Sequence, residues 1–323
     1  MSNLTVAVIA PPGYSKDLGK KGTTSDITFY NLKKGEATVT FVEPTRYPEK
    51  LSSLFYTISL ADRVVLVVDE INATFGESVL MLQSAGKAQG YLILKNYIST
   101  DQIAPLIKGT VLEHYEVIEE DIVGVRERLL DIAVKQTAHQ KIKEGGGNCV
   151  VPIDHHFNVK GVGVVILGSV ARGTIRKHDT LKVLPTEKTV QVRSIQKHDD
   201  DSDLAVTGDR IGLALKNVEA EELERGYVLT NDPEIKFSTV VTGKAQIVKY
   251  WPAPLKKGMV LYAGHWMQFL PTRVEKVVAD NDWRMPVITL SMEKAMVYPP
   301  GARIVLHYLE GGKLRVVGSM TLG

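Results

Sequence analysis

Residues 151–175 read VPIDHHFNVKGVGVVILGSVARGTI, and they predict the fold of more than half of the chain. Short apolar runs rich in β-branched side chains are interrupted here by glycines. Such runs are typical of short strands joined by tight turns. The pattern continues to residue 323 without a helical period of useful length. We therefore predict that this half of the chain is all-β.

Two breaks divide the chain into three predicted domains. Residues 141–147 read KIKEGGG, a charged turn and a glycine run with the composition of a linker. A second break, Asn231-Asp232-Pro233, splits the all-β half into two modules of about 85 residues, a size that suits small barrels. The predicted domains are residues 1–140, 148–232 and 233–323.

The first 140 residues alternate strand-like and helical patterns. Strand-length apolar runs occupy residues 4–10, 26–31, 37–43, 63–69, 91–95 and 115–118. Residues 77–89 and 122–135 carry apolar side chains at helical spacing. Buried strands that alternate with helices indicate βαβ crossovers and a doubly wound, mainly parallel sheet.

Composition narrows the class of protein. A formal net charge of +2 does not indicate a general nucleic-acid binder, so an RNA partner would require basic side chains gathered on one face. Cys149 is the only cysteine, which excludes an intramolecular disulfide and fits a reducing compartment. No apolar stretch approaches the about 20 residues of a membrane span, and we see no signal peptide. We expect a cytoplasmic protein with no membrane partner.

The loop after the first predicted strand departs from a phosphate-binding loop. The pattern G-x-x-x-x-G-K-[ST] is expected there, whereas residues 10–17 read APPGYSKD. Lys16 is in register, but Ala10 and Ser15 replace the two glycines, and Asp17 replaces the hydroxyl that would bind magnesium. The prolines also remove backbone N–H donors. We call residues 10–17 a degenerate nucleotide site.

The later nucleotide-binding motifs are altered as well. Residues 43–47 read EPTRY where D-x-x-G-H would bind magnesium and place the attacking water. Residues 94–97 read LKNY where N-K-x-D would recognise guanine. We therefore expect no catalytic residues, no enzymatic activity and no GTP cofactor. An unorthodox nucleotide site stays open, because the carboxyl edge of a parallel sheet is a natural ligand crevice.

Four segments of the second module follow one another in a characteristic order: VPIDHHFNVKG, VRSIQ at 192–196, GDRIGL at 208–213 and LERGYVL at 223–229. As a set they resemble the second domain of translational GTPases, the family of EF-Tu and the selenocysteine-specific elongation factors. The resemblance implies a degenerate P-loop GTPase-like α/β domain followed by two small antiparallel β-barrels.

The third module agrees with this resemblance. KGMVLYAG at 257–264 and PGARIVL at 300–306 are similar to strands of the family's third domain. Ile153-Asp154 and residues 193–196 are especially similar to selenocysteine factors. KKGTTSDIT at 20–28 resembles the selenocysteine-factor-like proteins of methanogenic archaea, which include one suggested to serve pyrrolysine.

In the family, the aminoacyl end of tRNA lies between the first and second domains. The positions that match this pocket are Asp154, His155, Phe157, His198 and Arg210. The resemblance implies that Asp154 receives the α-amino group, that Arg210 holds an anionic group and that Phe157 stacks on a base. An ion pair within the domain for Asp154 and Arg210, and a core position for Phe157, are the alternatives.

No metal site is expected. His155 and His156 are adjacent on a predicted strand and point to opposite faces, so they cannot chelate one ion together. The function implied by the resemblance is binding of aminoacyl-tRNA or a tRNA-like partner without GTP hydrolysis. A regulatory or scaffold protein that binds another protein, and an unorthodox GTPase, stay open as alternatives.

Overall fold

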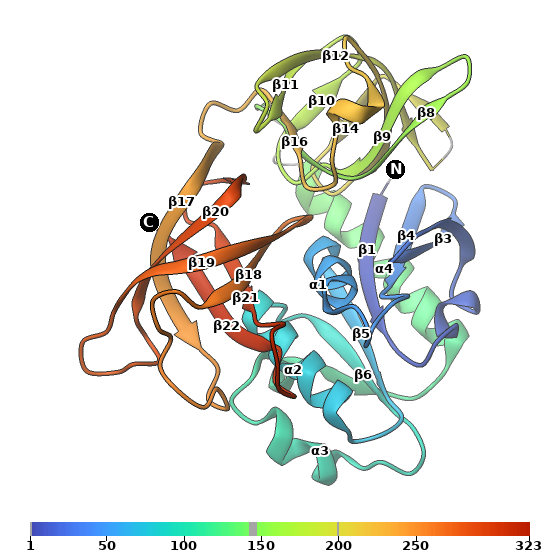
Figure 1. The fold of residues 1–323 in the computed structure, drawn as a ribbon. Coiled ribbons are helices and arrows are strands. Elements are labelled where there is room, and N and C mark those ends of the chain that lie inside the picture. Colours follow the sequence, from blue (N-terminus) through green and yellow to red (C-terminus); the bar gives the residue numbers. More distant parts are fainter. Residues whose placement is uncertain (1, 142–146, 199) are drawn as a thin grey trace.

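The computed structural model describes residues 2–141, 147–198 and 200–323. Most of the predicted linker lies outside these residues. Figure 1 shows an α/β domain that contacts two barrels, one formed by the middle of the chain and one by its C-terminal part. The α/β domain lies beside both barrels, so each barrel shares a boundary with it.

A mixed sheet of seven strands forms the first domain, in the order β2-β3-β4-β1-β5-β6-β7. Its strands are β1 (Ser2–Ile9), β2 (Lys20–Thr24), β3 (Thr28–Lys34), β4 (Ala37–Glu43), β5 (Arg63–Val68), β6 (Gly90–Leu94) and β7 (Glu116–Ile118). β1 pairs in parallel with β4 and β5, whereas β3 pairs antiparallel with β2 and β4. The doubly wound sheet predicted from the sequence is present, with an added antiparallel hairpin at one edge.

Helices cover both faces of this sheet. They are α1 (Leu51–Leu60), α2 (Ala73–Ala85), α3 (Thr100–Ile107) and α4 (Ile122–Lys141). Ala7 and Ile9 of β1 pack on the face that carries α1 and α2, while Val6 and Val8 pack towards α4. This alternation follows from the two-residue period of a strand, and it explains why residues 6–9 of β1 are all apolar.

The second domain is a closed barrel. Its six strands are β8 (Val150–Val159), β9 (Gly163–Ser169), β11 (Thr180–Leu184), β12 (Lys188–Lys197), β15 (Arg210–Lys216) and β16 (Val228–Thr230), and the β11–β12 pairing closes them. β13 (Asp200–Ser202) pairs with the end of β12 in antiparallel orientation. β10 (Thr174–Arg176) pairs with β14 (Leu204–Val206). The interior holds alternate residues of the strands, such as Val164 and Ile166 of β9.

The third domain is a second closed barrel of six strands. They are β17 (Lys236–Ile247), β18 (Val260–His265), β19 (Gln268–Val278), β20 (Val287–Tyr298), β21 (Arg303–His307) and β22 (Val316–Leu322). The prediction of two antiparallel barrels is therefore confirmed. Three single-turn 3₁₀ helices lie in loops: η1 (Tyr14–Lys16), η2 (Val111–His114) and η3 (Ala220–Glu222).

Candidate functional site

Backbone N–H groups of the loop at residues 10–17 donate to a carboxylate of the protein itself. Glu43, at the end of β4, accepts from Gly13 N–H at 3.1 Å and from Ser15 N–H at 3.3 Å. Gly13 can turn the chain there because its φ is 85°, in the left-handed region that favours glycine. Backbone N–H groups in such a loop attract anions. The Glu43 carboxylate is the anion that these two N–H groups bind in this structure.

The pocket beside Glu43 is unfavourable for a nucleotide phosphate. It has a volume of about 250 Å³ and lies at the carboxyl edge of the sheet. Glu43, Asp69 and Glu70 line it, and none of its described lining residues is basic. Three carboxylates without a compensating cation repel a polyanion. The alternative of a nucleotide site at this edge gains no support from its charge.

The residues predicted to form a degenerate nucleotide site do not share one pocket. Ser15 is fully buried, and its hydroxyl has no hydrogen-bond partner among the described residues. Ala10 lines the acidic pocket, whereas Lys16 and Asp17 are exposed and line a different cleft, between the first and second domains. Lys95, the lysine retained from the guanine-binding motif, pairs with Glu120 at 2.8 Å.

Asp154 and Arg210 form an ion pair inside the second domain. Arg210 Nη1 and Nη2 donate to the two Asp154 oxygens at 2.6 and 3.0 Å, and Asp154 is 1% exposed. Burial opposes ionisation, but the Arg210 charge and the His155 ring hold the pKa of Asp154 below its ordinary value. The ion pair that the sequence left open is therefore present, and both carboxylate oxygens are already bound.

His155 connects the Asp154–Arg210 ion pair to the first domain. Its Nδ1 donates to Asp154 at 2.6 Å, and its Nε2 lies 2.9 Å from Ser25 Oγ. Arg225 donates to both Asp26 oxygens at 2.7 and 2.9 Å, and its Nε donates to the Asp154 carbonyl. These contacts form a polar clamp, made of Ser25, Asp26, Asp154, His155 and Arg225, that joins the two domains. The sequence did not single out Ser25, Asp26 or Arg225 as parts of a common site.

The other two predicted pocket residues lie apart from the clamp. Phe157 is 40% exposed on β8, so it is not the core residue that the alternative required. His198 lies next to the first domain, with its Nε2 at 3.2 Å from Asn3 Oδ1. Of the five predicted residues, His198 and Arg210 line the cleft between the domains.

That cleft is basic. Its volume is about 880 Å³, and it lies between the β2–β3 hairpin and the β9–β15–β12 face of the second barrel. Asp17 is the one acidic residue among its described lining residues. Six lining residues are basic: Lys16, Lys20, Lys21, Lys33, Arg126 and Arg210. Lys33 pairs with Asp200 and Arg210 with Asp154, whereas no ion pair of the other four occurs within the described part of the chain. We call this the basic cleft.

Among the residues that the structure covers, no group of three or more His, Cys, Asp or Glu side chains could hold a metal ion. In the same residues, no helix has both the length and the apolar character needed to cross a membrane.

An α/β sheet domain followed by two closed six-stranded barrels is the architecture of translation factors of the EF-Tu type. Residues 163–230 match the family Elongation factor Tu domain 2. The selenocysteine-specific elongation factor of Methanocaldococcus jannaschii is 27% identical over 335 residues, which cover 91% of this chain and 69% of that protein. The chain belongs to the translational GTPase family and is an elongation-factor-like protein related to the selenocysteine-specific factors.

Two further comparisons extend this result. An uncharacterized protein of Methanocaldococcus jannaschii is 36% identical over 320 residues, covering 98% of this chain and 99% of that protein. The solved structure of translation elongation factor SelB from Methanococcus maripaludis, in its apo form, has a TM-score of 0.79 at 21% identity. It matches 100% of this chain, which covers 79% of that one, and it shows a shared fold.

Proposed function

We propose that this chain is a cytoplasmic elongation-factor-like protein that binds aminoacyl-tRNA or a tRNA-like RNA without a GTP cycle. The basic cleft is the observation that carries the proposal. It gathers six cations in a protein whose formal net charge is only +2, and four of them are in no ion pair within the described residues. Phosphate contacts need positive charge within reach of the RNA backbone, and a cleft between domains provides it.

Independence from GTP is supported by the degenerate nucleotide site. Glu43 accepts hydrogen bonds from the N–H groups of Gly13 and Ser15, and three carboxylates line the adjoining pocket. Displacing Glu43 would leave a buried carboxylate beside the incoming phosphates, and like charges at such distances are strongly unfavourable. Titration with GTP and magnesium in a calorimeter is expected to give no heat beyond dilution. Saturable binding would contradict this part of the proposal.

The RNA part is tested by filter binding of charged and uncharged tRNA across about 50 to 200 mM salt. We expect the affinity to fall as salt rises, because each phosphate contact releases a counterion. Exchanging Lys20→Glu and Lys21→Glu together should weaken binding and lower the salt slope by about one for each lysine. Lys276→Glu, an exposed lysine of β19, is the control and should leave binding unchanged. Salt-insensitive or absent binding at micromolar protein would overturn the proposal.

A further inference from the structure

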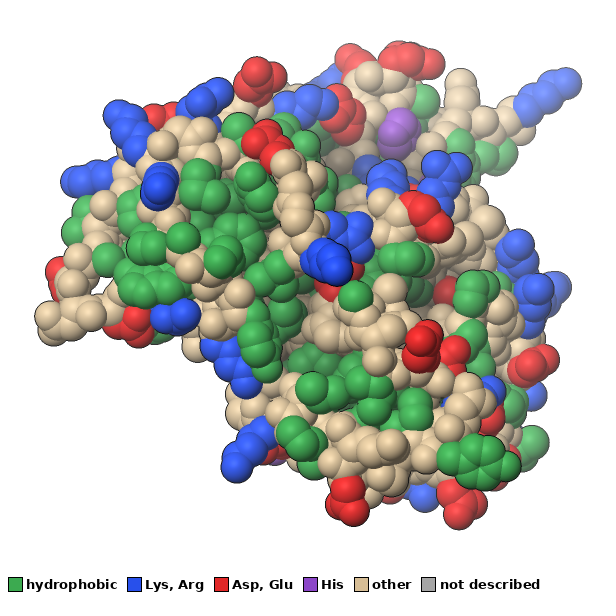
Figure 2. Space-filling model, turned by 60° about the horizontal axis from the view of Figure 1, so that its bottom comes forward, with side chains coloured by type: hydrophobic (Ala, Val, Ile, Leu, Met, Phe, Trp, Pro, Cys, Tyr) green, Lys and Arg blue, Asp and Glu red, His purple; other side chains and the backbone are tan. Residues whose placement is uncertain are grey.

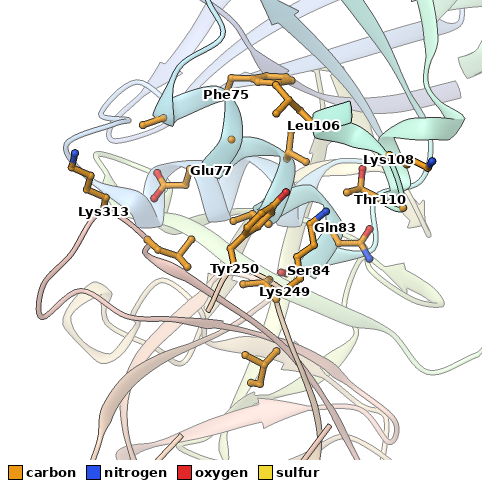
Figure 3. Close-up of a pocket in the computed structure, with 18 of the residues that line it drawn as sticks. Phe75, Glu77, Gln83, Ser84, Leu106, Lys108, Thr110, Lys249, Tyr250 and Lys313 are labelled. Atoms are coloured by element: carbon orange, nitrogen blue, oxygen red, sulfur yellow. The ribbon is translucent and has the colours of Figure 1, made fainter. Parts of the chain in front are cut away.

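A second large pocket lies on a different domain boundary. It has a volume of about 770 Å³ and is formed by α2, the turn between α3 and η2, and three loops of the third barrel (Figure 3). Cavities of about 300–1,000 Å³ are the usual size of ligand sites. In the space-filling view, a hollow lies where the third domain meets the first, with hydrophobic and basic side chains beside it (Figure 2). We call it the α2 pocket.

The floor of the α2 pocket is apolar, and part of it is in contact with water. The apolar lining includes Ile71, Phe75, Leu80, Leu106, Val248 and Leu314. Ile71 is 39% exposed and Leu106 is 40% exposed, and Tyr250 in the middle of the pocket is 55% exposed. A contiguous apolar surface that is exposed to solvent in the isolated chain commonly marks a binding site.

The rim is positively charged. Lys108, Lys249, Arg284 and Lys313 line the pocket, and no carboxylate pairs with any of them in the part of the chain that is described. The single acidic lining residue, Glu77, is held by Arg315, whose Nε donates to it at 2.8 Å. The rim cations therefore have no charge partner of their own within the pocket.

The cations stand at both ends of the apolar floor. Figure 3 shows Lys313 and Lys108 at opposite ends, with Lys249 and Tyr250 between them. A fatty acid carries one charged end and would leave the other end of the pocket without a partner. A peptide segment can place acidic side chains on both sides of an apolar stretch, and charge complementarity of this kind steers and orients partners.

We propose that the α2 pocket binds an acidic amphipathic segment of a partner protein. Apolar side chains of the segment enter between α2 and the third barrel, as in other helix-in-groove interfaces. Its acidic side chains pair with Lys108 at one end and with Lys313 at the other. The pocket lies on the boundary of the first and third domains, away from the basic cleft, so the proposal does not depend on RNA binding.

The proposal is tested on the full chain by fluorescence anisotropy with three labelled peptides. They share one length: a Leu/Phe core flanked by glutamates, the same core flanked by lysines, and a serine core flanked by glutamates. We expect saturable binding of the first peptide only. Equal binding of the lysine-flanked or the serine-core peptide would overturn the proposal, as would saturable binding of dodecanoate with no binding of the first peptide.

Variants locate the binding. Lys108→Glu combined with Lys313→Glu should lower the affinity for the glutamate-flanked peptide about tenfold. Lys244 is an exposed lysine of β17 outside the pocket, and Lys244→Glu should leave this affinity unchanged. Leu106→Glu should abolish binding, with Leu204→Glu (36% exposed in the native chain) as its control. Far-ultraviolet circular dichroism verifies folding. Binding that survives both pocket variants would overturn the proposal, and tRNA binding by the same variants reports separately on the proposed function.

Discussion

Single residues show how the domains are fitted to each other, and Gly264 is the clearest case. In β18 of the third barrel it faces Phe55 of α1, so close that an added Cβ would lie 2.6 Å from the Phe55 ring. Phe55 in turn packs against Phe269 and His307 of the same barrel, with ring centroids 5.8 and 5.3 Å away. The missing side chain of Gly264 is therefore what allows α1 to lie against the third barrel.

We predict that Gly264→Ala destabilises the protein by about 1–3 kcal/mol, because overpacking forces neighbouring rings off their preferred positions. Gly76→Ala is the matched control: Gly76 is exposed within α2, and a Cβ there meets nothing within 4 Å. That exchange should stabilise by about 0.5–1 kcal/mol through helix propensity. Urea unfolding measures both changes. Equal effects of the two exchanges would contradict the proposed packing role of Gly264.

At the scale of elements, the loop between β1 and β2 is held by Glu43. Ser15 of the short helix η1 and Gly13, which precedes this helix, donate their N–H groups to this carboxylate, and Glu43 itself is 7% exposed. The loop thus has an anion of the protein itself at its backbone N–H groups. The hydrogen bonds from Gly13 and Ser15 to Glu43 therefore tie this loop to the end of β4.

Exchanging Glu43→Ala should destabilise the protein by about 1–3 kcal/mol, since two N–H groups in a largely buried loop lose their acceptor. Amide hydrogen exchange at Gly13 and Ser15 should become faster. Glu49→Ala, at an exposed glutamate of the next loop, is the control and should change stability by less than about 0.5 kcal/mol. A neutral result for Glu43→Ala, with exchange at both amides unchanged, would show that the carboxylate does not hold the loop.

Several elements could be predicted from the sequence, and the exceptions have physical reasons. The predicted strand at residues 37–43 coincides with β4, and the helix at 122–135 begins with α4 at Ile122. α1 escaped prediction because it is buried on most sides, by its own sheet and by the third barrel. Its sequence, LSSLFYTISL, has apolar residues at helical spacing (Leu51, Leu54, Phe55 and Ile58), but it contains no charged residue that would mark a solvent-exposed face. α3 was missed too, and it has Pro105 inside it.

The candidate site was less predictable than the fold. Asp154 and Arg210 were found through the family resemblance, but their bidentate pairing depends on strands 56 residues apart in sequence. Asp26 and Arg225 are 199 residues apart, and nothing in the local sequence of either indicates the other. Contacts across a domain boundary depend on how domains dock, and local patterns carry no information on docking.

At the scale of the whole molecule, the polar clamp makes the boundary of the first two domains sensitive to acid. Burial would raise the pKa of Asp26, but hydrogen bonds and charge from Arg225 and Lys50 hold it at about 2. A carboxylate whose pKa is lowered in the folded state stabilises that state fully at pH values above its unfolded pKa of 3.8. This stabilisation is lost as the pH falls through about 2.

We therefore expect the unfolding free energy of the wild-type protein to be larger than that of Asp26→Asn at pH 6. At pH 3 this difference should be smaller by about 1 kcal/mol. Urea titrations of both proteins at the two pH values give this difference in unfolding free energy. The other carboxylates contribute equally to both proteins, so their contribution cancels in the difference. Asp131→Asn, at an exposed aspartate of α4, is the control and should show no such change. Since Asp26 and Arg225 lie on different domains, the radius of gyration from X-ray scattering of the wild type should also increase at low pH before unfolding. A difference that stays constant between pH 6 and pH 3 would mean that the Asp26–Arg225 pair does not fasten the two domains together.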